Sequence, residues 1–227
     1  MNFPIDISAV AFDLDGTLAD TLPDLYASAN LTMRDLGLDP VDRETVRNYI
    51  GQGIDRLVQR LLAGDPNGDP EPDELMRAGT IMRGHYRQLL TNESRLFPGT
   101  EETLHELKAL RLKLACVTNK TEAFTRPLLD KLGVLELFDE VICGDTLERK
   151  KPDPLPLTYL AGQFGIEPAT LLMVGDSQTD ALCARGAGCP IICLPHGYRS
   201  GMELHELDCD AIVASVCDLI DLIRPGY

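Results

Sequence analysis

Short apolar runs alternate with helical patterns along the second half of the chain. The run at 9–12, "AVAF", leads directly into "DLDGT", and later runs are "KLACVTN", "FDEVICGD", "LLMVGDS", "PIICLPHG" and "DAIVAS". Apolar residues recur at helical spacing between these runs, over 100–110, 121–132, 154–164 and 178–187, and again over 215–224. Short apolar runs bounded by turn residues are typical of buried strands, and strands that alternate with helices are typical of a parallel sheet. The pattern predicts an α/β fold with a three-layer core, a Rossmann-like parallel sheet with helices on both faces.

The segment from 19 to 91 has a different pattern, because it contains helical periodicity and turn residues without strand-like runs. Helices are predicted over about 22–36, 42–50, 54–63 and 73–90, and a loop rich in glycine, proline and acidic residues covers 64–74. A crossover between parallel strands needs only about a dozen residues. We therefore expect an all-helical cap domain, 19–91, inserted after the first strand of a core formed by 1–18 and 92–227.

Polar residues follow four of the predicted strands. Ligands of open parallel sheets bind beyond the carboxyl ends of the strands, so we expect these residues to converge on one site. Carboxylates offer the hard oxygen ligands that Mg²⁺ prefers, and a carboxylate can also attack phosphorus. The pattern therefore indicates phosphoryl transfer. The strand ends carry, in chain order, Asp13 and Asp15; Thr118, Asn119 and Lys120; Gly144 and Asp145, with Lys150 and Lys151 shortly beyond; and Gly175, Asp176, Ser177 and Asp180.

Composition and charge restrict the partners. The 227-residue chain is 44% hydrophobic and has a formal net charge of −15, which excludes nucleic-acid binding through the overall field of the protein. No apolar run approaches the ~18 residues of a membrane span. The first basic residue is Arg34, so the basic start of a secretory signal is missing, and the seven cysteines form no C-x-x-C pair. We expect a cytoplasmic enzyme with buried free thiols and a small-molecule partner.

Four motifs in order, "DLDGT", "VTNK", "KKPDP" and "GDSQTD", resemble those of the haloacid dehalogenase-like hydrolase superfamily. The position of the predicted cap is similar to that in members with a cap after the first motif. The segments "NYIGQGIDRLVQRLL" and "GDTLERKKPDPLPL" further resemble bacterial phosphoglycolate phosphatases. The resemblance covers nearly the whole chain and implies a Mg²⁺-dependent phosphatase that acts through an aspartyl-phosphate intermediate.

The resemblance also implies a role for each motif residue. Asp13 is expected to be the nucleophile and a Mg²⁺ ligand, and Asp15 the general acid and base, with its backbone carbonyl also on the metal. Asp176 is expected to complete the metal site. The phosphate is expected to be held by Thr118, Asn119 and Lys151. Asp180 is expected to orient Lys151 or a water on the metal, although it could also simply cap its helix.

A small phosphate monoester is the expected substrate, with 2-phosphoglycolate, hydrolysed to glycolate and phosphate, as the best single candidate. A sugar phosphate, including an amino-sugar acid 6-phosphate, is the main alternative, and a phosphomutase or a non-catalytic binding protein is a weaker one. Asp15 argues against a dehalogenase, which lacks this second acid. A phosphonate-cleaving enzyme of the superfamily needs a cap lysine, and 19–91 contains no lysine.

The cap is expected to recognise the substrate carboxylate through the loop "IGQG". Arg47 and Arg56 flank this loop most closely, and a guanidinium matches a carboxylate in shape. Backbone N–H groups of the loop at Gly51 and Gly53 are the alternative donors. The alternative is purely structural: both glycines only separate two helices, and most of the eight cap arginines are solvated residues on the helix surfaces.

Overall fold

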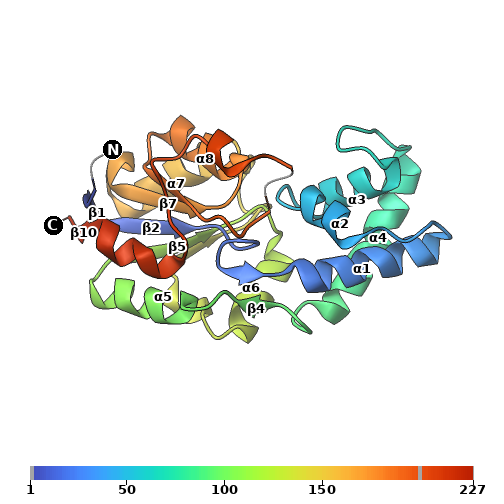
Figure 1. Cartoon of the computed structure of the whole chain (residues 1–227), viewed down its shortest axis with the longest axis horizontal. Coiled ribbons are helices and arrows are strands. Elements are labelled where there is room, and N and C mark those ends of the chain that lie inside the picture. The colour runs from blue at the N-terminus through green and yellow to red at the C-terminus, as the bar shows by residue number, and fades with distance from the viewer. Residues whose placement is uncertain (1–2, 199–200, 227) are drawn as a thin grey trace.

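The structure is a computed structural model, and it describes residues 3–198 and 201–226. Six strands form the central sheet in the order β6-β5-β2-β7-β8-β9, and all neighbouring strands in it run parallel (Figure 1). Because the chain builds the sheet outward in both directions from β2, the winding reverses there, and the carboxyl ends of β2, β5 and β7 lie together. The strands are β2 (Ala9–Phe12), β5 (Lys113–Val117), β6 (Glu140–Ile142), β7 (Leu171–Gly175), β8 (Ile191–Cys193) and β9 (Ala211–Ile212).

Helices cover both faces of this sheet. Side chains along β2 alternate between the faces, as the period of a strand requires. Val10 and Phe12 pack in one apolar cluster with α5 and α6, whereas Ala9 and Ala11 pack in a second cluster with α7 and α8. The predicted three-layer α/β core is therefore confirmed. The helices are α5 (Thr100–Ala109), α6 (Glu122–Lys131), α7 (Leu155–Phe164) and α8 (Gln178–Ala187).

Four helices form a separate lobe beyond one end of the sheet, and we call this lobe the cap (Figure 1). Its chain leaves the core through β3 (Ala19–Asp20) and returns through β4 (Arg95–Leu96), and these two strands pair antiparallel. Within the cap, α1 and α3 pack against α4. The all-helical insert is thus as predicted. The cap helices are α1 (Leu22–Leu36), α2 (Arg43–Tyr49), α3 (Ile54–Ala63) and α4 (Pro72–Leu89).

The end of the chain differs from the helix predicted over 215–224. The structure has a 3₁₀ helix, η4 (Val216–Leu222), and then a short strand, β10 (Ile223–Pro225), that pairs parallel with β1 (Ile5–Ile7). Pairing with a strand more than 200 positions away thus shortens the helix. Three further 3₁₀ turns are η1 (Leu135–Leu137), η2 (Pro168–Thr170) and η3 (Leu204–Glu206).

Most of the cysteines are buried free thiols, as the sequence predicts, whereas Cys209 is half-buried and Cys217 is exposed. All seven cysteines are free thiols, and five of them are buried. None of the helices in the described part of the chain combines the length and apolar character that crossing a membrane requires.

Candidate active site

Asp13 and Lys151 form a buried ion pair at the carboxyl end of the sheet. Asp13 directly follows β2, and its Oδ1 lies 2.8 Å from the Lys151 Nζ. The same ammonium donates to the carbonyl of Val117 at 2.6 Å and to Asp180 Oδ1 at 2.7 Å. Burial raises the pKa of Asp13 to about 7, against the opposing effect of the Lys151 charge. Three partners thus fix the lysine, which lies next to the expected nucleophile.

Asp176 follows β7 and lies beside Asp13. Its Oδ1 accepts a 2.6 Å hydrogen bond from the Thr17 hydroxyl, and its Oδ2 accepts one of 2.5 Å from the backbone N–H of Tyr198. Burial raises the pKa of Asp176 well above its ordinary value, and the charges of Asp180 and Asp13 raise it further. Asp13 and Asp180 pair with Lys151, whereas both of these donors to Asp176 are neutral. Carboxylates held this close and this deep are costly, so the arrangement favours a bound cation beside Asp176.

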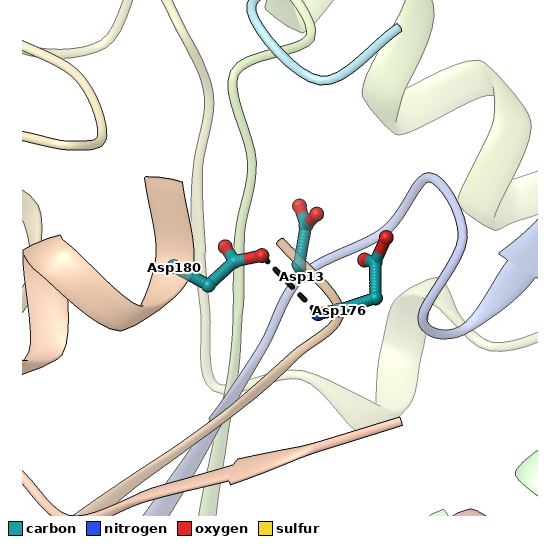
Figure 2. A group of neighbouring side chains, drawn as sticks. All are labelled: Asp13, Asp176 and Asp180. Atoms are coloured by element: carbon teal, nitrogen blue, oxygen red, sulfur yellow. Dashed lines mark hydrogen bonds between the residues drawn. The ribbon is translucent and has the colours of Figure 1, made fainter. Parts of the chain in front are cut away.

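Asp180 has a supporting position in the first turn of α8. Its Oδ2 accepts hydrogen bonds from the Ser177 hydroxyl at 2.6 Å and from the N–H groups of Ser177 and Asp176 at 3.1 and 3.2 Å. Oxygens of Asp13, Asp176 and Asp180 lie within 4.8 Å of one another. Figure 2 shows Asp13 between the other two side chains, with the Asp180 carboxylate turned toward it. Asp180 therefore both caps its helix and pairs with Lys151.

The donor set fits a magnesium ion. Asp13 and Asp176 supply carboxylate oxygens, and Mg²⁺ is bound through oxygen ligands. Asp180 instead pairs with Lys151 through Oδ1 and accepts three hydrogen bonds through Oδ2 from Ser177 and Asp176. The surrounding backbone is shaped to Asp176: a Cβ at Gly16, whose φ is +92°, would lie 2.9 Å from Asp176 Oδ2, and a Cβ at Gly197 would overlap the same side chain.

Thr118 and Asn119 follow β5 and are almost fully buried. The Asn119 amide donates to the carbonyl of Lys151 at 2.9 Å and to that of Gly51 at 3.0 Å. Its Oδ1 has no hydrogen-bond partner among residues 3–198 and 201–226. Asn119 thus links the backbone at Lys151, in the core, to the backbone at Gly51, in a loop of the cap.

Asp15 faces a different cation. Its two oxygens lie 2.7 and 2.8 Å from the Lys120 Nζ, and Oδ1 also accepts a 2.6 Å hydrogen bond from the Thr21 hydroxyl. Burial alone would lower the pKa of Lys120, but the combined effects of Asp15 and Tyr86 outweigh it and raise this pKa. The sequence places Lys120 at this edge of the sheet but assigns it no role; the available signal was its position directly after a core strand.

A loop of the cap, 50–53, closes over these residues. A narrow pocket separates this loop from the core residues, and its cap side is lined by Ile50, Gly51, Gly53 and Ile54. Gly53 has a φ of +91°, and a Cβ there would lie 3.0 Å from the carbonyl oxygen of Asn119. The predicted site residues lining the pocket are Asp13, Asp15, Gly51, Gly53, Thr118 and Asn119.

Arg47 and Arg56 do not line this pocket. The Arg47 guanidinium donates to the backbone carbonyls of His196 and Gly197 at 3.2 and 3.1 Å. That of Arg56 bonds within the cap, to Gln59 at 2.8 Å and to the carbonyl of Pro66 at 3.1 Å. The structure thus brings the core motifs and the cap glycines together, and it places the two arginines elsewhere.

Comparisons with known proteins agree with this architecture. The family model described as haloacid dehalogenase-like hydrolase matches residues 10–194. A phosphoglycolate phosphatase of Nitrosospira multiformis is 48% identical over 224 residues, which cover 99% of each chain. The crystal structure of a predicted phosphoglycolate phosphatase from Haemophilus somnus has a TM-score of 0.90 and 36% identity, covering 94% of this chain and 96% of that one.

A more distant solved structure carries a ligand. It is a mutant of CbbY from Rhodobacter sphaeroides in complex with xylulose-(1,5)bisphosphate, with a TM-score of 0.80 and 26% identity over 96% of this chain and 100% of that one. The family match and the full-length relatives lead to one conclusion. The chain belongs to the haloacid dehalogenase-like hydrolases, and it is a phosphoric monoester hydrolase of that family.

Proposed function

We propose that this enzyme is a Mg²⁺-dependent phosphatase that hydrolyses 2-phosphoglycolate to glycolate and phosphate through an aspartyl-phosphate. The observation that carries the proposal is the Asp13 carboxylate, which is paired with Lys151 at 2.8 Å, lies beside Asp176 and faces a closed pocket. The free thiols further support a reducing compartment, the cytoplasm.

In the first step, an oxygen of Asp13 attacks phosphorus and the bond from phosphorus to the ester oxygen breaks. Asp15 gives a proton to that oxygen, which leaves with glycolate, and later removes a proton from the water that attacks the aspartyl-phosphate. Lys151, Thr118 and Asn119 hold the phosphoryl group, and Asp180 keeps Lys151 in place.

Asp13, Asp176 and the backbone carbonyl of Asp15 would hold the magnesium ion. When bound, the ion offsets negative charge on the carboxylates and on the phosphoryl group, whose stabilisation dominates this type of catalysis. The enzyme itself supplies the nucleophile, the proton donor and the fixed ammonium of Lys151.

The choice of substrate rests on two observations. Relatives that are 48% and 45% identical over nearly the whole chain are phosphoglycolate phosphatases. The cap loop 50–53 lies directly over the core residues of the pocket and is bonded to Asn119, which favours a small substrate. A sugar-phosphate phosphatase is the second candidate, supported by the sugar bisphosphate in the CbbY structure.

A panel of phosphate esters tests the proposal. We expect the highest kcat/KM for phosphoglycolate when Mg²⁺ is present, compared with ethyl phosphate, hexose 6-phosphates, an amino-sugar acid 6-phosphate and pentose bisphosphates. A higher kcat/KM for a sugar ester would support the second candidate. An isomerised sugar phosphate without release of phosphate would reveal a mutase, and no turnover of any ester would indicate a binding protein.

A further inference from the structure

Lys120 is a buried cation of the pocket that the chemistry above does not use. Its side chain is 3% exposed, and its ammonium contacts both oxygens of Asp15. Lys151, in contrast, pairs with Asp13. An ammonium buried without a partner is costly, so Lys120 needs another anion whenever Asp15 moves away.

Asp15 cannot serve the leaving group in this arrangement. Its Oδ1 accepts from Thr21 and Lys120, and its Oδ2 also faces Lys120. For Asp15 to carry a proton to the ester oxygen, at least one of its oxygens must separate from the lysine. Catalysis therefore requires the ion pair between Asp15 and Lys120 to loosen.

The surroundings of Lys120 are suited to an incoming anion. Its ammonium lies 5.0 Å from the ring centre of Tyr86, whose buried hydroxyl has no hydrogen-bond partner in the described part of the chain. Across the pocket, α3 starts at Ile54, and its N-cap residue, Gly53, has no side chain to engage the first N–H groups. The pocket therefore has the Lys120 ammonium on its core side and the start of α3 on its cap side.

We propose that Lys120 selects substrates with a second anionic group, because a substrate carboxylate replaces Asp15 at its ammonium and thereby releases Asp15 to the leaving oxygen. The exchange breaks one ion pair and forms another without a change in covalent bonds, and Asp15 takes its proton from solvent. In phosphoglycolate a single carbon joins the carboxylate to the ester oxygen. The carboxylate can therefore contact Lys120 while the ester oxygen lies next to Asp15, since these two residues are neighbours. The inference rests on the phosphatase function proposed above.

The first test compares phosphoglycolate with ethyl phosphate, in which a methyl group replaces the carboxylate. Lys120→Met should reduce the ratio of the two kcat/KM values by roughly 10–100-fold, the effect of one charge-assisted hydrogen bond. Inhibition by 3-phosphonopropionate should weaken by a similar factor relative to propylphosphonate. The exposed Lys131, changed to Met, is the matched control and should leave both ratios unchanged. Equal losses for both members of each pair would show a merely structural lysine and overturn the proposal.

The second test uses the wild-type enzyme and does not depend on the folding of a variant. Formate and methyl phosphate together contain the heavy atoms of phosphoglycolate. Formate should accelerate hydrolysis of methyl phosphate in a saturable manner, because it occupies Lys120 and frees Asp15. No effect of formate, or inhibition by it, would contradict the exchange.

The two proposals fail in different ways. A wild-type enzyme with no preference for phosphoglycolate over ethyl phosphate contradicts the proposed substrate. A wild-type preference that persists in both Lys120→Met and Lys120→Gln contradicts only the role of Lys120.

Discussion

Asp13 and Asp15 are two positions apart in the sequence, yet their side chains have different partners. Asp13 pairs with Lys151, which reaches the site from the loop after β6, and Asp15 pairs with Lys120, at the end of β5. Each carboxylate therefore has its own cation. In the proposed mechanism the two carboxylates also have different tasks, since Asp13 attacks phosphorus and Asp15 moves a proton once its ion pair with Lys120 has loosened.

Removal of the nucleophile should stop turnover without unfolding the protein. In Asp13→Asn the amide keeps the shape of the side chain but cannot attack phosphorus, so we expect no measurable kcat. Asp15→Asn should slow proton transfer by roughly 10²–10⁴-fold in each step. Steady-state kinetics with phosphoglycolate and circular dichroism of each variant check both points. Near-normal kcat in Asp13→Asn would exclude Asp13 as the nucleophile.

The buried position of Asp13 should make the stability of the metal-free protein depend on pH. Burial raises its pKa from 3.8 to about 7, so between these values the native state holds a proton that the unfolded chain has released. The free energy of unfolding should therefore fall as pH rises through this range. Thermal unfolding in excess chelator between pH 4 and 8 measures the slope. The slope should become shallower in Asp13→Asn, and an unchanged slope would contradict this origin.

The ion pair of Lys120 with Asp15 is a contact that sequence patterns do not predict. Its side chain meets Asp15 across 105 positions, because β5 and β2 are neighbours in the sheet. A local pattern specifies the strand and the residue that ends it, but the partner of that residue depends on strand order and on rotamers. The expected roles of Asp13, Asp176 and Asp180 rested on motifs, and the structure brings these carboxylates within reach of one another.

Some secondary-structure elements can be predicted from their own sequence, whereas others depend on partners far away in the chain. β2, β5 and β7 are apolar runs that are buried on both faces, so their sequences alone indicate strands. In contrast, β1, β3, β4 and β10 have two or three residues each, too few for a periodic signal, and distant partners define them. β1, β3 and β4 are therefore absent from the predicted elements, and the predicted helix over 215–224 includes the start of β10.

Glycine at position 53 should be required for closure of the cap, not only for the shape of the loop. In Gly53→Ala the positive φ costs roughly 1–2 kcal/mol, and the new methyl group meets the Asn119 carbonyl. Displacement of the cap should lower kcat/KM for phosphoglycolate by up to about 100-fold. Gly64→Ala is the matched control, since Gly64 ends the same helix with a positive φ and has open space around it. Similar kinetics for the two variants would show that the loop does not close the site.

Arg47 should act as a contact between cap and core. Its bonds to the carbonyls of His196 and Gly197 hold α2 on the loop that carries the Tyr198 N–H to Asp176. Arg47→Ala should reduce kcat/KM by about 10-fold for phosphoglycolate and ethyl phosphate alike. Arg56→Ala, which removes bonds only within the cap, should have little effect. A loss confined to phosphoglycolate would instead support the sequence-based expectation that one of these arginines binds the carboxylate.

On the scale of the whole molecule, the overall charge of −15 repels an anionic substrate, so bound cations must provide the local attraction. A chelator should abolish activity, and Mg²⁺ should restore it, with Mn²⁺ as a substitute. Ca²⁺ should bind without supporting turnover, because its looser coordination disturbs the alignment of the nucleophile. An ion that binds only the native state raises Tm, because it increases the free energy of unfolding by ~2.7 kcal/mol when its concentration is a hundred times Kd. Activity at full rate in excess chelator would remove the metal from the mechanism.

The short ribbon formed by β3 and β4 places the start and the end of the cap side by side (Figure 1). A chain that turned directly from Asp20 to Arg95 would keep the pairings of β2 with β5 and β7. Insertion, loss or exchange of the helical lobe during evolution would therefore leave the sheet and the carboxylates at its edge in place. The cap can therefore change without altering the strand pairings of the core, because one continuous part of the gene encodes it.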